Sequence, residues 1–318
     1  MTILNRLPAP WCIVVADDHG HEWAPPNRSD EGATPVQYAR LGGSSTLLQR
    51  ALGRATRLSP ASQVMVTVLE EYREFWEPST WFVRPDHRFI CESRAESTLT
   101  AATAVLKIAG NSPSNVVVIL PGCVQVRREC VLESALGDAI AALSLVPEGV
   151  LTLAMIDPEH GVDEDYLVLD RSACCIGQQV LGVARRPNTW VAHLLRQQGA
   201  LIASGIVIGY AGALAAHVSR QWPGLTRQLN DAATTATAAS AECELSTRIS
   251  CRGLRPALAS LRWHAPTLKQ RALTVAGCGW NGLRSARAVA RAHDYAAAVA
   301  KIRVPTQSPA TMKHPILS

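Results

Sequence analysis

The chain has 318 residues, of which 47% are hydrophobic and 18% are charged, and this composition excludes an intrinsically disordered protein. The net charge of +5 comes from 31 Lys and Arg against 26 Asp and Glu, which are scattered without a long basic run. We therefore expect no nucleic-acid partner. No linker rich in Pro, Gly or Ser divides the middle of the chain, so we expect a single domain over 1–300 and a tail over 301–318.

The cysteines and the N-terminal residues indicate a reducing compartment. The nine cysteines contain no C-x-x-C pair, which favours buried thiols over a zinc site. The sequence MTILNRLPAP has neither a basic leader nor a long apolar run, so we expect no secretory signal. The uncharged stretch Gly199–Ala216 consists mainly of small residues and favours a buried strand followed by a helix over a membrane span. We expect a cytoplasmic protein without a membrane partner.

Apolar runs and helix-length segments alternate along the first half of the chain. The run Cys12–Ala16, the amphipathic segment Thr46–Leu58 and the run Val64–Leu69 predict a βαβ unit. A strand, a helix, a strand, a helix and a strand are then predicted at Arg88–Cys91, Leu99–Ala109, Val116–Leu120, Glu129–Leu145 and Val150–Ile156. This order predicts an α/β protein with a mainly parallel sheet covered by helices on both faces.

The predicted sheet places ligands outside the carboxyl ends of its strands. We expect 12–16, 64–69, 116–120 and 150–156 to be neighbouring strands, with the turns after Ala16 and Leu120 opening on one cleft. The signals in the second half are weaker. They predict strands at Val180–Ala184 and Leu201–Ile208, a helix at Trp190–Arg196, and a helix or connector at Asp231–Ala241.

Six fragments carry a resemblance to a known family. Pro35–Leu52, PVQYARLGGSSTLLQRAL, is close to the pattern P-K-Q-F-x-x-L-x-G-x-x-S-L-L-Q-x-T. Five weaker fragments follow in the same order, at Cys91–Ala102, Leu120–Val124, Ala184–Pro187, Leu201–Ile206 and Gly279–Leu283. The chain thus resembles the sugar-phosphate nucleotidyltransferases, particularly the mannose-1-phosphate guanylyltransferases. This resemblance implies a Rossmann-like, glycosyltransferase-A-like fold with a nucleotide-side half over 10–170 and a sugar-side half over 171–300.

The resemblance also implies a reaction and a set of site residues. A sugar 1-phosphate oxygen attacks the α-phosphorus of a nucleoside triphosphate and pyrophosphate leaves, while Mg²⁺ and basic side chains neutralise the developing charge. The implied nucleotide-binding positions are Ala16, Gly20, Gln37, Ser97, Thr98 and Pro121. The implied sugar-binding positions are Tyr166, Arg186, Ser204 and Gly205.

Many of the charged positions that this chemistry needs are changed. Val36 stands where the pattern has Lys, and Cys123 and Gly282 stand where it has two metal-binding Asp residues, so the implied Mg²⁺ ligands are absent. The Gly-Tyr-Gly of the sugar-binding strand falls on the three acidic residues 163–165. In the first loop, acidic residues replace two glycines and a phosphate-binding Arg, at Asp17, Asp18 and Glu22.

The acidic first loop opposes phosphate binding. A carboxylate about 5 Å from a phosphate oxygen costs roughly 3 kcal/mol at an effective dielectric constant near 20. His19 and His21 lie in the same loop and, with these carboxylates, could gather a transition metal or form a solvated turn. His160 belongs to a second acidic patch that is open to the same two interpretations.

The leading functional hypothesis is a catalytically impaired relative of the mannose-1-phosphate guanylyltransferases. It would bind a nucleotide such as GTP, or a nucleotide sugar, and act as a binding or regulatory partner in nucleotide-sugar or polysaccharide metabolism. One alternative is an active sugar-1-phosphate nucleotidyltransferase with relocated ligands. A second alternative is a structural subunit that pairs with an active paralogue, and a homo-oligomer is also compatible with the sequence.

Overall fold

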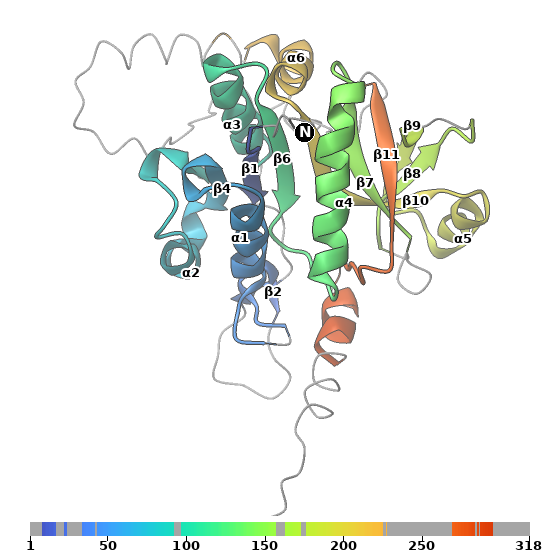
Figure 1. Cartoon of the computed structure of the whole chain (residues 1–318). Helices are drawn as coiled ribbons and strands as arrows, with labels where there is room; N and C mark the ends of the chain where they lie inside the picture. The colour runs from blue at the N-terminus through green and yellow to red at the C-terminus, as the bar shows by residue number, and fades with distance from the viewer. Residues whose placement is uncertain are drawn as a thin grey trace, which may run out of the picture.

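The computed structural model is an α/β protein in which helices flank a central sheet (Figure 1). It describes residues 8–16, 22–23, 34–41, 43–91, 97–156, 163–172, 176–224, 227, 269–283, 285 and 287–294. The predictions for Asp231–Ala241 and for the tail over 301–318 fall outside these ranges. The first-loop residues 17–21 and His160 also fall outside them.

Four parallel strands form one side of the sheet. They are β1 (Trp11–Val15), β4 (Val64–Leu69), β5 (Arg88–Cys91) and β6 (Val116–Pro121), in the order β5-β4-β1-β6. β1 pairs in parallel with β4 on one side and with β6 on the other. All six residues of β4 are buried, as expected for a continuous apolar run in a sheet covered on both faces. The βαβ prediction for this region is confirmed.

The sheet departs from the prediction beyond β6. The next strand is β10 (Leu201–Tyr210), which runs antiparallel to β6 and to β7 (Val150–Ile156). The expectation that 116–120 and 150–156 are direct neighbours is therefore wrong, although both strands point the same way. An apolar run shows that a strand is buried, but it does not show where the strand inserts or in which direction.

The remaining strands close on themselves. β11 (Gln270–Ala276) pairs in parallel with β7, and β9 (Gln178–Ala184) and β8 (Tyr166–Leu169) follow it with antiparallel pairings. β8 also pairs with the start of β10, so the strands β10-β7-β11-β9-β8 form a closed set of five. The α/β class is confirmed, whereas the single, mainly parallel Rossmann-like sheet is found only in the β5-β4-β1-β6 part.

Helices cover both faces of the sheet, as expected. α1 (Leu47–Leu58) and α4 (Glu129–Ala142) share one apolar core with Cys12 and Val14 of β1. Ile13, which points the opposite way, packs in a second core with α3 (Ser97–Asn111) and α6 (Ala211–Gln221). Figure 1 shows α1 and α4 in front of the sheet. Smaller elements complete the fold, namely β2 (Glu22–Trp23), β3 (Thr34–Pro35), α2 (Arg73–Trp76) and α5 (Thr189–Gln197).

Local signals set the ends of these helices. Thr46 and Gln49 form a capping box at the start of α1, in which each side chain accepts a hydrogen bond from the backbone N–H of the other. Asn188 caps α5 by accepting a hydrogen bond from the N–H of Val191, and Gly199 follows that helix with a φ of +78°. The stretch Gly199–Ala216 is a strand running into a helix, as predicted. None of the helices in the described ranges is long and apolar enough to cross a membrane.

Candidate functional site

The carboxyl ends of β1 and β6 meet at one place in the sheet. The N–H of Gly122 donates to the carbonyl of Val15 at 2.7 Å, and a Cβ at position 122 would lie 2.8 Å from that oxygen. Only glycine allows this approach without a shift of the backbone. The side-chain amide of Gln37 donates to the carbonyl of Ala16 at 3.4 Å. The structure thus brings together Ala16, Gln37 and Pro121, three of the expected nucleotide-binding positions.

The other expected nucleotide-binding positions are less fully described. Gly20 lies outside the described residues. Ser97 and Thr98 begin α3, and their side chains are not among those that the structure describes. The site can therefore be built in detail only from the turns after β6 and β11 and from the segment before β8.

The position expected to carry the phosphate-binding lysine lies inside an apolar cluster. Val36 is fully buried, in a 3-10 turn (Val36–Tyr38) that leads toward α1. It belongs to a cluster that we call the apolar junction, against which the partly buried Cys123 packs. The members of the apolar junction are Val36, Ala39, Leu41, Leu47, Leu283, Val289 and Ala292. Among the three positions where the family pattern has a charged residue, 36 and 123 therefore meet at the apolar junction. The apolar junction also contains Leu283, which directly follows the third position, Gly282.

That third position, Gly282, is covered by a carboxylate from another element. A Cβ at position 282 would lie 2.7 Å from each carboxylate oxygen of Glu164 and 2.7 Å from the indole of Trp280. Glu164 is only 3% exposed. The structure therefore places the carboxylate of Glu164 in the space that an Asp side chain at position 282 would enter.

The acidic segment 163–165 joins several parts of the sugar side. Asp163 accepts a hydrogen bond from the hydroxyl of Ser285 at 2.6 Å, and the same hydroxyl caps the helix at 287–294. The carboxylate of Asp165 accepts from the backbone N–H of Arg186 at 3.1 Å. The carbonyl of Asp165 accepts from the N–H of Ala203 at 2.8 Å. The two carboxylates join the segment before β8 to the helix at 287–294 and to the turn after β9, and the Asp165 carbonyl joins it to β10.

The expected sugar-binding residues surround this segment. Tyr166 is fully buried on β8, opposite Ile202 of β10. The hydroxyl of Ser204 is buried and donates to the carbonyl of Leu153 at 2.6 Å, while accepting from the N–H of Ile206 at 3.0 Å. Both bonds shape the irregular register of β10, where Gly205 has a φ of +77°.

Magnesium, which the sequence resemblance implies, does not fit the residues present here. Mg²⁺ prefers several hard oxygen ligands, whereas these positions supply the thiol of Cys123 and the carboxylate of Glu164. Across the described part of the chain, no three His, Cys, Asp or Glu side chains gather closely enough to hold a metal ion.

Sequence reasoning did not identify how the acidic segment is used. Three consecutive acidic residues at the positions of Gly-Tyr-Gly indicated only a loss of sugar contacts.

The turn after β11 joins the turn after β6 through a two-bond bridge, in which Gln125 and Asn281 exchange backbone hydrogen bonds of 2.9 and 2.8 Å. The bridge holds the turn that carries Gly282 beside β6, and no residue motif announces it.

Comparison with known proteins relates the chain to others by structure alone. No family model matches it, and no curated protein matches it in sequence. The crystal structure of a mannose-1-phosphate geranyltransferase from Thermus thermophilus superposes with a TM-score of 0.66 at 18% identity, covering 89% of this chain and 79% of the other. A mannose-6-phosphate isomerase from Helicobacter pylori gives a TM-score of 0.54 at 12% identity, covering 85% and 98%.

A third structure is the inositol-1-phosphate CTP transferase from T. maritima, with a TM-score of 0.51 at 10% identity, covering 91% of this chain and 96% of the other. At such low identities the similarity establishes the fold and does not transfer an activity. The chain therefore resembles the sugar-phosphate nucleotidyltransferases in fold, in agreement with the resemblance of its sequence motifs.

Proposed function

We propose that the chain is a nucleotidyltransferase-fold protein, similar to the mannose-1-phosphate guanylyltransferases, that is impaired in nucleotidyl transfer. It binds a nucleotide or nucleotide sugar and acts as a binding or regulatory partner in nucleotide-sugar or polysaccharide metabolism. The proposal depends on one observation. The positions where the family pattern has charged side chains are packed against other side chains in this chain. Val36 is buried in the apolar junction, Cys123 packs against it, and Gly282 is covered by Glu164.

The packing around position 36 disfavours restoring the expected lysine by a single substitution. A lysine at position 36 would place its ammonium group among buried apolar side chains, where a charge without a partner is strongly disfavoured. Transfer of a nucleotidyl group needs cations against the phosphates, because negative charge accumulates on them in the transition state.

A retained capacity to bind is supported by Gln37. Its side chain is 1% exposed, and its Oε1 has no hydrogen-bond partner in the described part of the chain. A buried acceptor without a partner costs about 1–3 kcal/mol, so a ligand group or a water molecule that donates to it stabilises the folded state.

A second candidate function, an active transferase with relocated ligands, is favoured by Glu164. This residue brings a carboxylate to the space beside position 282 from the segment before β8 instead of from the turn after β11. An active transferase with a rearranged site would need such a relocated carboxylate. The impaired protein is expected to show no turnover, whereas the active transferase is expected to show it.

Two measurements on the purified full chain separate the candidates. Pyrophosphate release is measured with GTP, mannose 1-phosphate and Mg²⁺, and the melting temperature is measured with GTP and with GDP-mannose, with and without Mg²⁺. We expect no pyrophosphate release and a rise in melting temperature with at least one of the two nucleotides, because a ligand of the native state raises its apparent stability.

Turnover in the ordinary enzyme range of roughly 1 to 1,000 per second would overturn the proposal in favour of the active transferase. That activity should then be lost in Glu164→Gln and kept in Asp138→Asn, a matched loss of one exposed carboxylate on α4. If neither turnover nor a thermal shift is found, the binding role is wrong and a structural subunit is the better description.

A further inference from the structure

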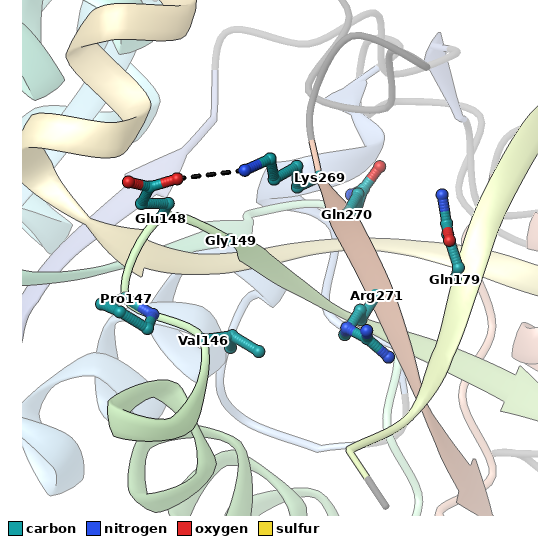
Figure 2. A pocket seen from close by; sticks show the side chains of 8 residues that line it. All are labelled: Val146, Pro147, Glu148, Gly149, Gln179, Lys269, Gln270 and Arg271. Atoms are coloured by element: carbon teal, nitrogen blue, oxygen red, sulfur yellow. Dashed lines mark hydrogen bonds and ion pairs between the residues drawn. The ribbon is translucent and has the colours of Figure 1, made fainter. Parts of the chain in front are cut away.

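A pocket lies at the end of the sheet opposite the candidate site. β7 and β11 are paired in parallel from Val150 and Gln270 onward, and the pocket lies where both strands begin (Figure 2). The other end of β11 leads to the turn that carries Gly282. Since β7 spans seven residues, the two places are separated by about 20 Å at about 3.3 Å per residue.

The shape of the pocket suits a small organic molecule. Its volume is 490 Å³, which lies within the usual range of small-molecule sites. The loop between α4 and β7 forms one wall with Val146 and Pro147, and β9 contributes Gln179 from the other side. Gly149 brings this loop against the start of β11, because a Cβ there would lie 3.2 Å from the carbonyl oxygen of Lys269.

The charged side chains of the pocket are two cations and one carboxylate. Lys269 directly precedes β11 and Arg271 is the second residue of that strand, and both side chains line the pocket. Nη1 of Arg271 also donates long hydrogen bonds to the carbonyls of Ile176 and Gly177, at 3.4 and 3.5 Å. Lys269 pairs with Glu148 at 3.0 Å, but the two side chains are 79% and 82% exposed. A pair this exposed contributes at most about 1 kcal/mol, so a ligand anion can replace Glu148 as the partner of Lys269 at little cost.

We propose that this pocket is a second ligand site, which takes a small organic phosphate. The phosphate group lies between Lys269 and Arg271, where a point charge and a planar guanidinium supply charge-assisted hydrogen bonds. The carbon part of the ligand packs on Val146 and Pro147, and the amide of Gln179 meets its hydroxyl groups. This site is independent of the proposed nucleotide-side function, because it lies at the other end of β7 and β11.

The test is calorimetric titration of the full chain with glycerol 3-phosphate, glucose 6-phosphate and inorganic phosphate, with citrate as a carboxylate comparison. We expect at least one of the two organic phosphates to bind with a Kd near 1 mM or below, and more tightly than inorganic phosphate or citrate. Lys269→Gln should weaken that binding about tenfold, which corresponds to the loss of one charge-assisted hydrogen bond. Glu148→Gln should tighten it, because the competing carboxylate is removed.

Matched control variants distinguish binding in this pocket from nonspecific attraction of the phosphate group to the charged surface of the protein. Arg84→Gln removes an exposed cation that pairs with Asp86 elsewhere on the molecule, and Asp138→Asn removes an exposed carboxylate on α4. Neither should change the Kd by more than about twofold. The proposal is overturned if neither organic phosphate binds by about 10 mM, if citrate binds more tightly than both, or if the controls change the Kd as much as the pocket variants. Glu148 is exposed, so its variant keeps the test valid even if Lys269→Gln fails to fold.

Discussion

At the residue scale, the carboxylate of Glu164 occupies the space that a side chain at position 282 would need. Gly282→Ala should lower the free energy of unfolding by about 1–3 kcal/mol, because its Cβ would meet the Glu164 carboxylate and Trp280 at 2.7 Å. Gly282→Asp should cost more, since it would force a second carboxyl group against the buried one of Glu164. Urea denaturation measures both effects.

Gly110→Ala on α3 is the matched control, because the Cβ it would add meets no atom within 4 Å apart from its chain neighbours and the backbone of its own helix. It should leave stability unchanged or raise it by up to about 1 kcal/mol, since alanine favours the helix. Adding Glu164→Ala to Gly282→Asp should recover part of the loss. If Gly282→Asp is as stable as the unmodified chain, the carboxylate of Glu164 does not fill that space.

Cys12 makes a prediction about pH. Burial raises the pKa of the Cys12 thiol to about 12, although the hydrogen bond with Ser59 at 3.2 Å lowers it in part. The thiol therefore stays protonated in the folded state while it ionises in the unfolded chain above about pH 8.5, so this group makes stability fall as pH rises from there toward about 12. A Cys12→Val variant should show a smaller fall over this range in denaturation curves.

Thiol chemistry gives a second measurement of the same property. At about pH 8.5 we expect iodoacetamide to modify the exposed Cys130 and to leave Cys12 unmodified, as read by peptide mass spectrometry. Equal modification of both residues in the folded chain would show that Cys12 is not held as a buried thiol.

At the scale of elements, a buried ion pair ties α1 to α4. The guanidinium of Arg54 donates to both carboxylate oxygens of Glu129 at 2.7 and 2.9 Å, and Arg54 is 1% exposed while Glu129 is 31% exposed. Glu129→Ala leaves a buried cation without this partner and should cost about 2–4 kcal/mol of unfolding free energy. Urea denaturation measures the cost.

A neighbouring pair supplies the control for Arg54 and Glu129. Glu133 pairs with Arg57, which is 48% exposed, so Glu133→Ala should cost at most about 1 kcal/mol. The double variant Arg54→Met with Glu129→Leu should recover most of the stability lost in Glu129→Ala, because no buried charge remains. A cost for Glu129→Ala no greater than that for Glu133→Ala would mean that the buried pair does not hold the two helices together.

At the scale of the whole molecule, the two expected halves share one sheet. β10 belongs to the sugar-side half by sequence, yet it lies between β6 and β7 of the nucleotide-side half. β11 likewise pairs along its whole length with β7. Because β6 and β7 each pair with a strand of the other half, we expect the described parts of both halves to unfold together, and the single domain over 1–300 stays a prediction.

Cooperative unfolding tests the single domain. Glu129→Ala changes the nucleotide-side half, and Gly177→Ala changes the sugar-side half, where φ is +61° and a Cβ would lie 2.5 Å from the carbonyl of Ala272. Each variant should shift one common transition seen by tryptophan fluorescence and by circular dichroism, and the two effects should add within about 0.5 kcal/mol. A separate second transition in either variant would contradict one cooperative unit.

The sequence by itself determined most of the helices and strands, among them the parallel strands β1, β4, β5 and β6. Continuous apolar runs such as Val64–Leu69 are buried wherever they lie, and Thr46 with Gln49 marks a helix start by local hydrogen bonds. β11 was not predicted, because the residues of Gln270–Ala276 are mixed in polarity and its place depends on pairing with β7. The motif fragments also identified positions 36, 123 and 282 as changed, and the structure places all three near the carboxyl ends of β6 and β11.

Only the tertiary structure decided what replaced the lost groups. The insertion of β10 between β6 and β7, the closure of β8 onto β10, and the approach of Glu164 to Gly282 join residues that are far apart in sequence. Residue patterns report local preference and burial, whereas strand order, strand direction and the contact between a side chain and a distant glycine depend on how the whole chain packs. For the same reason, the sequence showed only that position 282 lacks the expected aspartate. The fold showed that the carboxylate of Glu164 lies in that space.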